Sequence, residues 1–294
     1  MTDAALVAFL AWAVERLGLR WEGLRNFRRT VRKRLVRRMA ELGLGNLDEY
    51  RARIEVDASE EAVLEAMCRI PISRLYRDRA VFDLLASEIL PARARAAERE
   101  GRRAVRIWSA GCASGEEPHT VAIVWHVVIA PQHPNVELEL LATDADEGML
   151  ARGRRGGYSE GSLRELPPHL RETALRPGRV TPTTRAPEGR SGPAHDDDPQ
   201  LFYVRDELRA GLTFRREDVR RAMPEGPFDV VLCRNMLLTY IDVRLQPPLL
   251  EQLIARLLPG GALVIGSREA MPPGIPRVQL RGPGVYIAAD SAGR

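Results

Sequence analysis

The chain has few of the residues that build disulfide frameworks or metal sites. Its 294 residues include only three cysteines, Cys68, Cys112 and Cys233, which lie far apart. No two of them have the spacing of a metal-ligand pair, and an odd, sparse set does not indicate disulfides. The five histidines are scattered, and none belongs to an HExxH pattern. We therefore expect no metal site and a reducing compartment, the cytoplasm.

Long apolar runs and aromatic residues are also scarce. No apolar stretch reaches the roughly 18 residues that a membrane-spanning helix needs. The first residues, Met1-Thr2-Asp3, lack the positive charge that precedes the apolar part of a secretory signal. Aromatic residues make up 5% of the chain, which is little material for stacking on nucleic-acid bases. We therefore expect neither membrane insertion nor nucleic-acid binding.

Positive charge, by contrast, is concentrated near the N-terminus. Eight basic residues and no acidic residue lie between Arg25 and Arg38, in a chain whose net charge is only +4. Within this run Val31, Leu35 and Met39 recur every four positions, which predicts an amphipathic helix with arginines on its other faces. Such a helix would attract an acidic helical partner, or it would simply form a solvated face.

The hydrophobic pattern divides the chain into two domains. Residues 1–75 are predicted to be helical, whereas residues 76–294 alternate strands with helices. Strands are predicted over residues 104–108, 136–142, 228–233 and 262–266, and helices over residues 116–130, 147–154 and 247–258. This alternation is typical of a doubly wound parallel sheet. We predict an α/β fold, in which a small basic all-helical domain precedes a Rossmann-like doubly wound domain.

Two further segments complete the prediction. Residues 278–280 and 285–288 flank Gly282-Pro283-Gly284, which predicts a closing hairpin. Residues 181–199 are rich in Pro, Gly, Ser, Thr and charged residues, which predicts a flexible insertion.

The loop after the first predicted strand carries the first candidate site. Gly111 and Gly115 permit a tight turn and close approach of a ligand to the backbone. Glu116 and Glu117 stand at the entrance of the next helix, where a dinucleotide site would receive pyrophosphate. Two carboxylates would repel pyrophosphate but suit a ligand with an amino group and a sulfonium, such as S-adenosylmethionine. The alternative is that both acids only complement the helix dipole.

Polar residues follow two more predicted strands. Thr143 and Asp144 come directly after the strand predicted at 136–142. An acid at this position can accept hydrogen bonds from both ribose hydroxyls. A helix cap is the alternative role for this residue. Arg234 and Asn235 follow the strand at 228–233 and are expected to face the same crevice, because ligands bind beyond the carboxyl ends of the strands. Here the alternative is a solvated arginine and a capping asparagine.

These segments together resemble the CheR-type chemotaxis receptor methyltransferases, which methylate glutamate side chains of chemoreceptors. The resemblance covers nearly the whole chain and is carried by residues 73–78, 107–118, 142–144, 228–235 and 259–261. It implies a helical domain joined to a Rossmann-like methyltransferase domain with a small β insert. It also implies S-adenosylmethionine as cofactor and a carboxylate as methyl acceptor. The partner of the Arg25–Arg38 helix would then be a chemoreceptor helix.

The resemblance implies roles for individual residues around the cofactor. Glu117 would bind the methionine part and Asp144 the ribose, while Asp218 stands where the family usually has an adenine-contacting Asn. Arg234 and Asn235 would line the pocket, beside the turn that Gly111 and Gly115 permit.

Three further residues are expected to reach the site. Ser73, in place of a usual Thr, and Arg77 come from the segment between the domains. Arg77 would orient the acceptor carboxylate or close over the cofactor, and Tyr240 would contact the sulfonium by cation–π attraction. A glutamate acceptor has an ordinary pKa of about 4.3 and is already ionised at pH 7, so direct in-line transfer needs no general base. The enzyme would act by positioning and by excluding water.

The sequence departs from the family pattern at several positions. Pro71 replaces an Asn, Leu75-Tyr76 replaces two Phe residues, and His119 and Thr239 each replace a Tyr. These departures keep two alternatives open. One is a methyltransferase with a different protein or small-molecule acceptor, and the other is a catalytically silent cofactor-binding signalling module.

Overall fold

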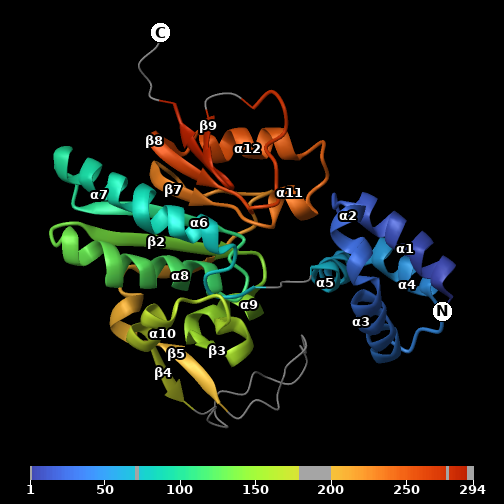
Figure 1. Ribbon diagram of the computed structural model, residues 1–294. Coiled ribbons are helices and arrows are strands. Elements are labelled where there is room, and N and C mark those ends of the chain that lie inside the picture. The colour runs from blue at the N-terminus through green and yellow to red at the C-terminus, as the bar shows by residue number, and fades with distance from the viewer. Residues whose placement is uncertain (1, 70–72, 179–199, 276–277, 290–294) are drawn as a thin grey trace. The chain divides into compact units, whose positions relative to one another are not determined.

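The computed structural model describes residues 2–69, 73–178, 200–275 and 278–289 (Figure 1). Contacts within the chain define two units: unit 1 is residues 1–72 with 235–248, and unit 2 is residues 73–234 with 249–294. Nothing in the sequence pattern indicated that residues 235–248 belong with the N-terminal helices. In the described ranges no helix has the length and apolar character needed to cross a membrane. The predicted flexible insertion at 181–199 lies outside the described residues.

Unit 1 is a cluster of short helices around an apolar interior. Its helices are α1 (Asp3–Arg16), α2 (Trp21–Leu24), the 3₁₀ turn Arg25–Phe27, α3 (Arg28–Glu41), α4 (Leu47–Val56), α5 (Ala58–Cys68) and α11 (Leu237–Tyr240). The predicted amphipathic helix is confirmed as α3, which buries Val31, Leu35 and Met39. Side-chain oxygens of Asn46 and Asp57 accept hydrogen bonds from the first-turn amides of α4 and α5, as helix caps do.

Residues 235–248 are held in unit 1 by backbone pairing. The amide of Arg20 donates to the carbonyl of Tyr240 over 2.8 Å, and its guanidinium donates to the carbonyl of Leu238 over 2.7 Å. Gly23 of α2 lies so close that a Cβ there would stand 2.7 Å from the carbonyl oxygen of Thr239. The lack of a side chain at Gly23 therefore allows α2 and α11 to pack together.

Unit 2 contains a seven-stranded sheet in the order β6-β2-β1-β7-β8-β10-β9. The parallel strands are β1 (Ala104–Ala110), β2 (Glu137–Asp144), β6 (Leu212–Arg216), β7 (Phe228–Leu232) and β8 (Leu257–Val264). The predicted hairpin is confirmed as β9 (Val278–Gly282) and β10 (Val285–Ala288), which pair antiparallel. Every residue of β7 is buried, as expected for a strand covered on both faces.

The helices of unit 2 connect and cover these strands (Figure 1). They are α6 (Arg79–Leu84), α7 (Leu90–Arg99), α8 (Glu116–Val124), α9 (Glu147–Arg155) and α10 (Pro168–Ala174), while α12 (Gln246–Ile254) begins at the end of unit 1. Five-residue π-helical turns join α6 to α7 and extend α8. A second, antiparallel sheet orders β3 (Gly157–Tyr158), β5 (Leu201–Val204) and β4 (Leu175–Gly178), and it forms the small β insert. The α/β doubly wound class is thus confirmed.

One boundary prediction was wrong. The helix expected to run to Leu258 ends at Ile254, and Pro259-Gly260-Gly261 lies inside β8 instead of stopping the helix. The strand accommodates these residues because its register against β7 shifts between Phe228 and Val230. Gly260 has φ +65° at this irregularity, a conformation that glycine adopts without steric cost.

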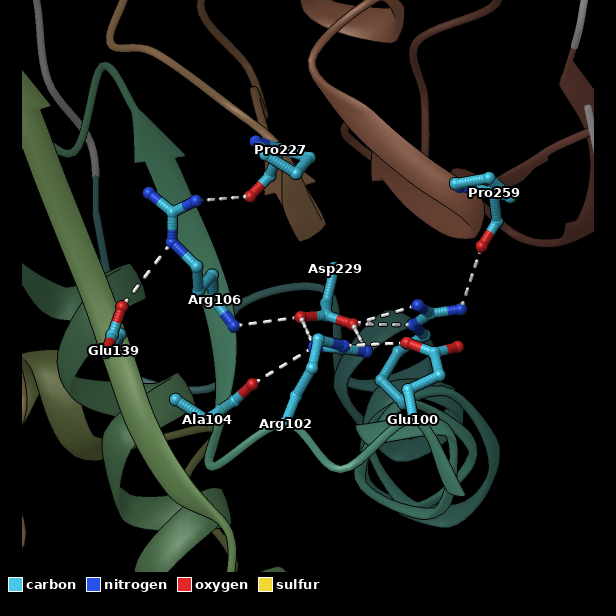
Figure 2. Close-up of polar contacts among 9 residues, drawn as sticks. Glu100, Arg102, Ala104, Arg106, Glu139, Pro227, Asp229 and Pro259 are labelled. Carbon is cyan, nitrogen blue, oxygen red and sulfur yellow. Dashed lines mark hydrogen bonds and ion pairs between the residues drawn. The ribbon is translucent and has the colours of Figure 1, made fainter. Parts of the chain in front are cut away.

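A buried ion cluster fastens β7 to the start of β1 (Figure 2). The Asp229 carboxylate is 0% exposed and accepts hydrogen bonds from Arg93 Nε over 2.9 Å, from Arg102 over 3.0 and 3.1 Å, and from the Arg106 amide over 2.9 Å. Arg93 also donates to the carbonyl of Pro259, which ties β8 to the same point. The cluster therefore connects three neighbouring strands at the end of the sheet opposite to the predicted site.

Candidate functional site

The ends of β1 and β2 build one turn together. The amides of Gly111 and Cys112 donate to the carbonyl of Thr143 over 2.8 and 2.9 Å. The Asp144 carboxylate accepts the amides of Ala113 and Asp146, each over 2.9 Å. These bonds follow from the parallel register that sets Ala110 opposite Thr143. Asp144, predicted to bind ribose, therefore also shapes the turn at residues 111–115, which we call the cofactor turn.

Gly115 ends the cofactor turn in a position where no side chain fits. Its φ is +86°, and a Cβ there would lie 2.9 Å from the Cα of Gly153 and 3.1 Å from the Tyr158 hydroxyl. Gly111, with φ +75°, shares this left-handed conformation. The two predicted glycines thus allow the tight turn, and the missing side chain of Gly115 lets the turn pack against Gly153 and Tyr158.

A buried hydrogen-bond network supports the cofactor turn from behind. The Tyr158 hydroxyl on β3 donates to the carbonyl of Ser114 over 3.0 Å and lies 2.6 Å from His119 Nδ1. His119 Nδ1 also lies 2.9 Å from the carbonyl of Gly115, so this nitrogen carries the proton. Burial lowers the pKa of His119 to about 3, which keeps the ring neutral. The network links the small β sheet directly to the cofactor turn.

The two acids at the start of α8 have different surroundings. Glu117, with a side chain 12% exposed, accepts hydrogen bonds from Ser109 over 2.7 Å and from Arg234 over 3.1 Å. Burial raises the pKa of Glu117, against the opposing effects of Arg234 and Ser109. Glu116 is buried and accepts a 2.8 Å hydrogen bond from Ser114. The argument for a cationic ligand therefore rests on Glu117, while Glu116 holds the turn.

Arg234 is enclosed by protein and is not the solvated residue of the alternative interpretation. Its side chain is 3% exposed, and its Nη2 donates to the carbonyl of Arg77 over 2.6 Å and to Asp78 over 2.9 Å. Its guanidinium carbon lies 4.8 Å from the ring centre of Phe82. Its Nε is buried without a hydrogen-bond partner among the described residues. Arg234 thus joins the end of β7 to α8 and to the segment before α6.

That segment, residues 73–78, is a strap tied onto unit 2 by its backbone. The Leu75 amide donates to the carbonyl of Ser162 over 2.9 Å, and the Tyr76 amide donates to Thr120 Oγ1 over 2.9 Å. The Asp78 amide donates to Glu165 Oε2 over 3.2 Å.

The strap holds an unfavourable backbone conformation next to the predicted site residues. Tyr76 and Asp78 have φ +61° and +62°. Aspartate tolerates this left-handed conformation, whereas at Tyr76 it costs on the order of 1–3 kcal/mol. Arg77 lies between them, and Ser73 begins the strap. Asp78 was not predicted as a site residue, although it directly follows Arg77. The signal that would have found it is its contact with Arg234, which only the folded chain shows.

Asp218 lies two residues beyond β6, the strand that pairs with β2 in the sheet. It forms two ion-pair contacts with Arg220, over 3.0 Å to Nε and 2.5 Å to Nη2. The neighbouring amide of Glu217 donates to the carbonyl of Asp144 over 2.9 Å, so this segment is joined to the predicted ribose residue. A carboxylate can accept from the exocyclic amine of adenine but cannot donate to its ring nitrogens, as the usual Asn can.

Asn235 and Tyr240 belong to unit 1, so their roles toward the residues of unit 2 stay predictions. Asn235 has φ +52°, a left-handed conformation that asparagine tolerates better than most residues. Tyr240 ends α11, and a Cβ added at Gly23 would stand 3.0 Å from its ring.

The residues of unit 2 fit S-adenosylmethionine on chemical grounds. A nearly buried carboxylate, Glu117, suits the cationic methionine part, and carboxylate oxygens such as those of Asp144 can each accept more than one hydrogen bond. Gly111 and Gly115, both with positive φ, set a tight turn at the carboxyl ends of β1 and β2, where ligands bind in a doubly wound sheet. Among the described residues, no group of three His, Cys, Asp or Glu side chains is arranged to hold a metal.

Comparison with known proteins gives consistent matches. Residues 72–184 and 190–280 match the family model described as CheR methyltransferase, SAM binding domain. The chain is 29% identical over 242 residues to a probable chemotaxis protein methyltransferase of Rhizobium etli, covering 81% of this chain and 83% of that protein. It is also 29% identical over 270 residues to the chemotaxis protein methyltransferase of Salmonella typhimurium, covering 89% and 83%. Chemotaxis protein methyltransferase 2 of Pseudomonas aeruginosa is 29% identical over 241 residues, covering 81% and 77%.

Proposed function

Because the chain belongs to the CheR methyltransferase family and its cofactor is S-adenosylmethionine, we propose that it methylates a carboxylate, the glutamate side chain of a chemoreceptor-like protein. The relatives named above carry the words chemotaxis protein methyltransferase in their names, which supports this acceptor. Such an acceptor would be met in the cytoplasm, the compartment expected from the sparse cysteines.

The observation that carries the proposal is the position of Arg77 on the strained strap. Its carbonyl is held by Arg234, which also binds Glu117, so the strap is fixed beside the residue expected to bind the methionine part. A guanidinium presented there would bind an acceptor carboxylate through charge-assisted, bidentate hydrogen bonds. This arrangement favours an acidic acceptor over a neutral amine or hydroxyl.

When bound, S-adenosylmethionine supplies an electrophilic methyl group on a sulfonium. In this proposal Glu117 would bind its methionine part, Asp144 its ribose and Asp218 its adenine, and Tyr240 would present an aromatic face to the sulfonium. Arg77 would align the acceptor oxygen with the methyl carbon. The strap residues Leu75 and Tyr76 are buried, so the strap packs closely on unit 2, and in this proposal it would help to keep water from the acceptor and the methyl group.

Acidic partners would bind the exposed face of α3. Arg29, Arg32 and Lys33 are exposed, whereas two of the basic residues hold unit 1 together. Arg34 donates to the carbonyls at the end of α5, each over 2.9 Å, and Arg38 pairs with the buried Glu60 over 2.6 Å. The docking surface for a chemoreceptor helix is therefore proposed to be the exposed subset, not the whole run from Arg25 to Arg38.

The direct test is methyl transfer to a purified chemoreceptor signalling domain. The protein is incubated with S-adenosylmethionine labelled in the methyl group, and the product is then treated with alkali. A carboxyl ester releases labelled methanol, whereas an N-methyl product does not. We expect alkali-labile label that is lost in Arg77→Ala and kept in the control Arg79→Ala, whose side chain is 67% exposed.

Two other results would replace the proposal. Alkali-stable label would show a different acceptor chemistry. Cofactor binding without transfer to any acceptor would favour the silent signalling module, which Pro71 and the other departures from the family pattern keep open.

A further inference from the structure

We infer that Asp78 is a positioning residue that raises the affinity of the site for the sulfonium cation of S-adenosylmethionine relative to its affinity for the neutral thioether of S-adenosylhomocysteine. It does so by sharing Arg234 with Glu117. The inference concerns cofactor binding alone, so it can fail while the proposed acceptor stands, and the reverse also holds.

The geometry is a single buried cation between two carboxylates. Arg234 Nη1 donates to Glu117 over 3.1 Å, and Nη2 donates to Asp78 over 2.9 Å. The exposed fractions of these side chains are 3% for Arg234, 12% for Glu117 and 16% for Asp78. Little water reaches the three groups, so their charges are weakly screened.

Asp78 is fixed in this position by groups from three other elements. Its carboxylate also lies 3.4 Å from the amide of Ser267, beyond β8, and its own amide donates to Glu165 over 3.2 Å. Burial raises the pKa of Asp78, but Arg234 and Ser267 together outweigh burial and hold it below its usual value. Asp78 is therefore ionised at neutral pH.

Sharing leaves Glu117 incompletely neutralised. If Arg234 faced Glu117 alone, the pair would be neutral, and a cation would gain little from binding beside it. With Asp78 and Glu117 both ionised, the three groups carry one negative charge. Further charges around them are Glu165, at the Asp78 amide, and Arg77, which acts on Glu117. Removal of the Asp78 charge makes the net charge around Glu117 more positive by one unit. This change is the same whatever the other nearby charges contribute.

The two cofactor forms isolate this effect. They share the amino acid, ribose and adenine groups and differ by the methyl group and the charge on sulfur. A change of one charge near Glu117 therefore alters the affinity for the sulfonium form more than the affinity for the thioether. One unit charge in a partly buried setting is expected to change the ratio of the two dissociation constants on the order of tenfold.

Asp78→Asn is a conservative variant for this test. Asparagine and aspartate both tolerate the left-handed conformation that φ +62° requires. The side-chain oxygen of asparagine can still accept from Arg234, so the contact remains while the charge is lost. Asp78→Gly is a second variant, because glycine adopts this conformation without strain and carries no carboxylate. Asp83→Asn is the matched control. This 53% exposed carboxylate pairs with Arg79 within α6 and accepts from the Tyr76 hydroxyl over 3.0 Å, a hydrogen bond that the asparagine oxygen can still accept.

The experiment is calorimetric titration of the full chain with each cofactor form at pH 7, without acceptor. For Asp78→Asn and Asp78→Gly we expect the dissociation constant for S-adenosylmethionine to rise about tenfold relative to that for S-adenosylhomocysteine. Asp83→Asn should leave the ratio unchanged. Equal weakening of both forms would assign Asp78 a purely structural role, and an unchanged ratio with unchanged affinities would remove it from cofactor selection; either result overturns the inference.

Discussion

Replacement of Asp229 by alanine should destabilise unit 2 more than any comparable surface substitution. The carboxylate is 0% exposed and accepts four hydrogen bonds, three from guanidinium groups and one from the Arg106 amide. Its loss leaves the Arg93 side chain, only 9% exposed, with the carbonyl of Pro259 as its remaining acceptor. Removal of one partner from a buried ion pair costs about 3–5 kcal/mol, because the other charge stays buried without compensation.

The assay is thermal and urea unfolding of Asp229→Ala, compared with a variant that removes an exposed aspartate from its ion pairs. Asp206 is 69% exposed and pairs with Arg176 and Arg209, so Asp206→Ala should cost at most about 1 kcal/mol. For Asp229→Ala the expected loss corresponds to a fall in Tm of roughly 6–20 °C. The cluster lies at the far end of the strands from the cofactor turn, so folded Asp229→Ala should still bind S-adenosylhomocysteine. A loss as small as that of Asp206→Ala would refute the assignment of Asp229 as the main tie between β1, β7 and β8.

Three further predictions concern the site and the basic helix. Tyr158→Phe removes the hydroxyl between His119 and Ser114, so the free energy of unfolding should fall by about 1–3 kcal/mol and S-adenosylhomocysteine should bind more weakly. The control Tyr203→Phe, on β5, should change neither quantity. His119 has a pKa of about 3 when folded against 6.5 in model compounds, so only the unfolded chain gains a proton between these values. Stability should therefore fall as the pH drops from about 6.5 toward 3, and pH titration should show a shallower fall in His119→Asn. Arg29→Glu with Lys33→Glu should weaken co-sedimentation with receptor-bearing vesicles without lowering S-adenosylhomocysteine affinity, and unchanged sedimentation would remove α3 from docking.

The sheet was predictable because its strands bear strong local signals. β1 and β7 are short, mostly apolar runs, β2 begins with alternating glutamates and leucines, and Gly282-Pro283-Gly284 marks the hairpin of β9 and β10. The edge strand β6, with three polar residues among five, was not predicted. The boundary between α12 and β8 was missed because Pro259-Gly260-Gly261 ordinarily ends a helix. Only the register shift against β7 lets these residues continue a strand.

The site was predictable where a residue follows a strand or opens a helix. Glu117 and Arg234 could be named in this way, and they meet over 3.1 Å. Asp78 and Tyr158 could not, because each reaches the site through packing between elements distant in sequence. The same limit explains why residues 235–248 were not expected in unit 1.

The measurement that tests the account most directly is titration of S-adenosylhomocysteine into the wild-type chain, Asp144→Ala and Asp146→Ala. Asp146 is the matched control, because its carboxylate, like that of Asp144, accepts hydrogen bonds from backbone amides. These amides lie in the first turn of α9. We expect one-to-one binding that Asp144→Ala weakens at least about tenfold, a loss of about 1.4 kcal/mol, and that Asp146→Ala leaves nearly unchanged. Absence of binding in the folded wild-type chain, or equal weakening by both variants, would contradict the placement of the cofactor at the ends of β1 and β2.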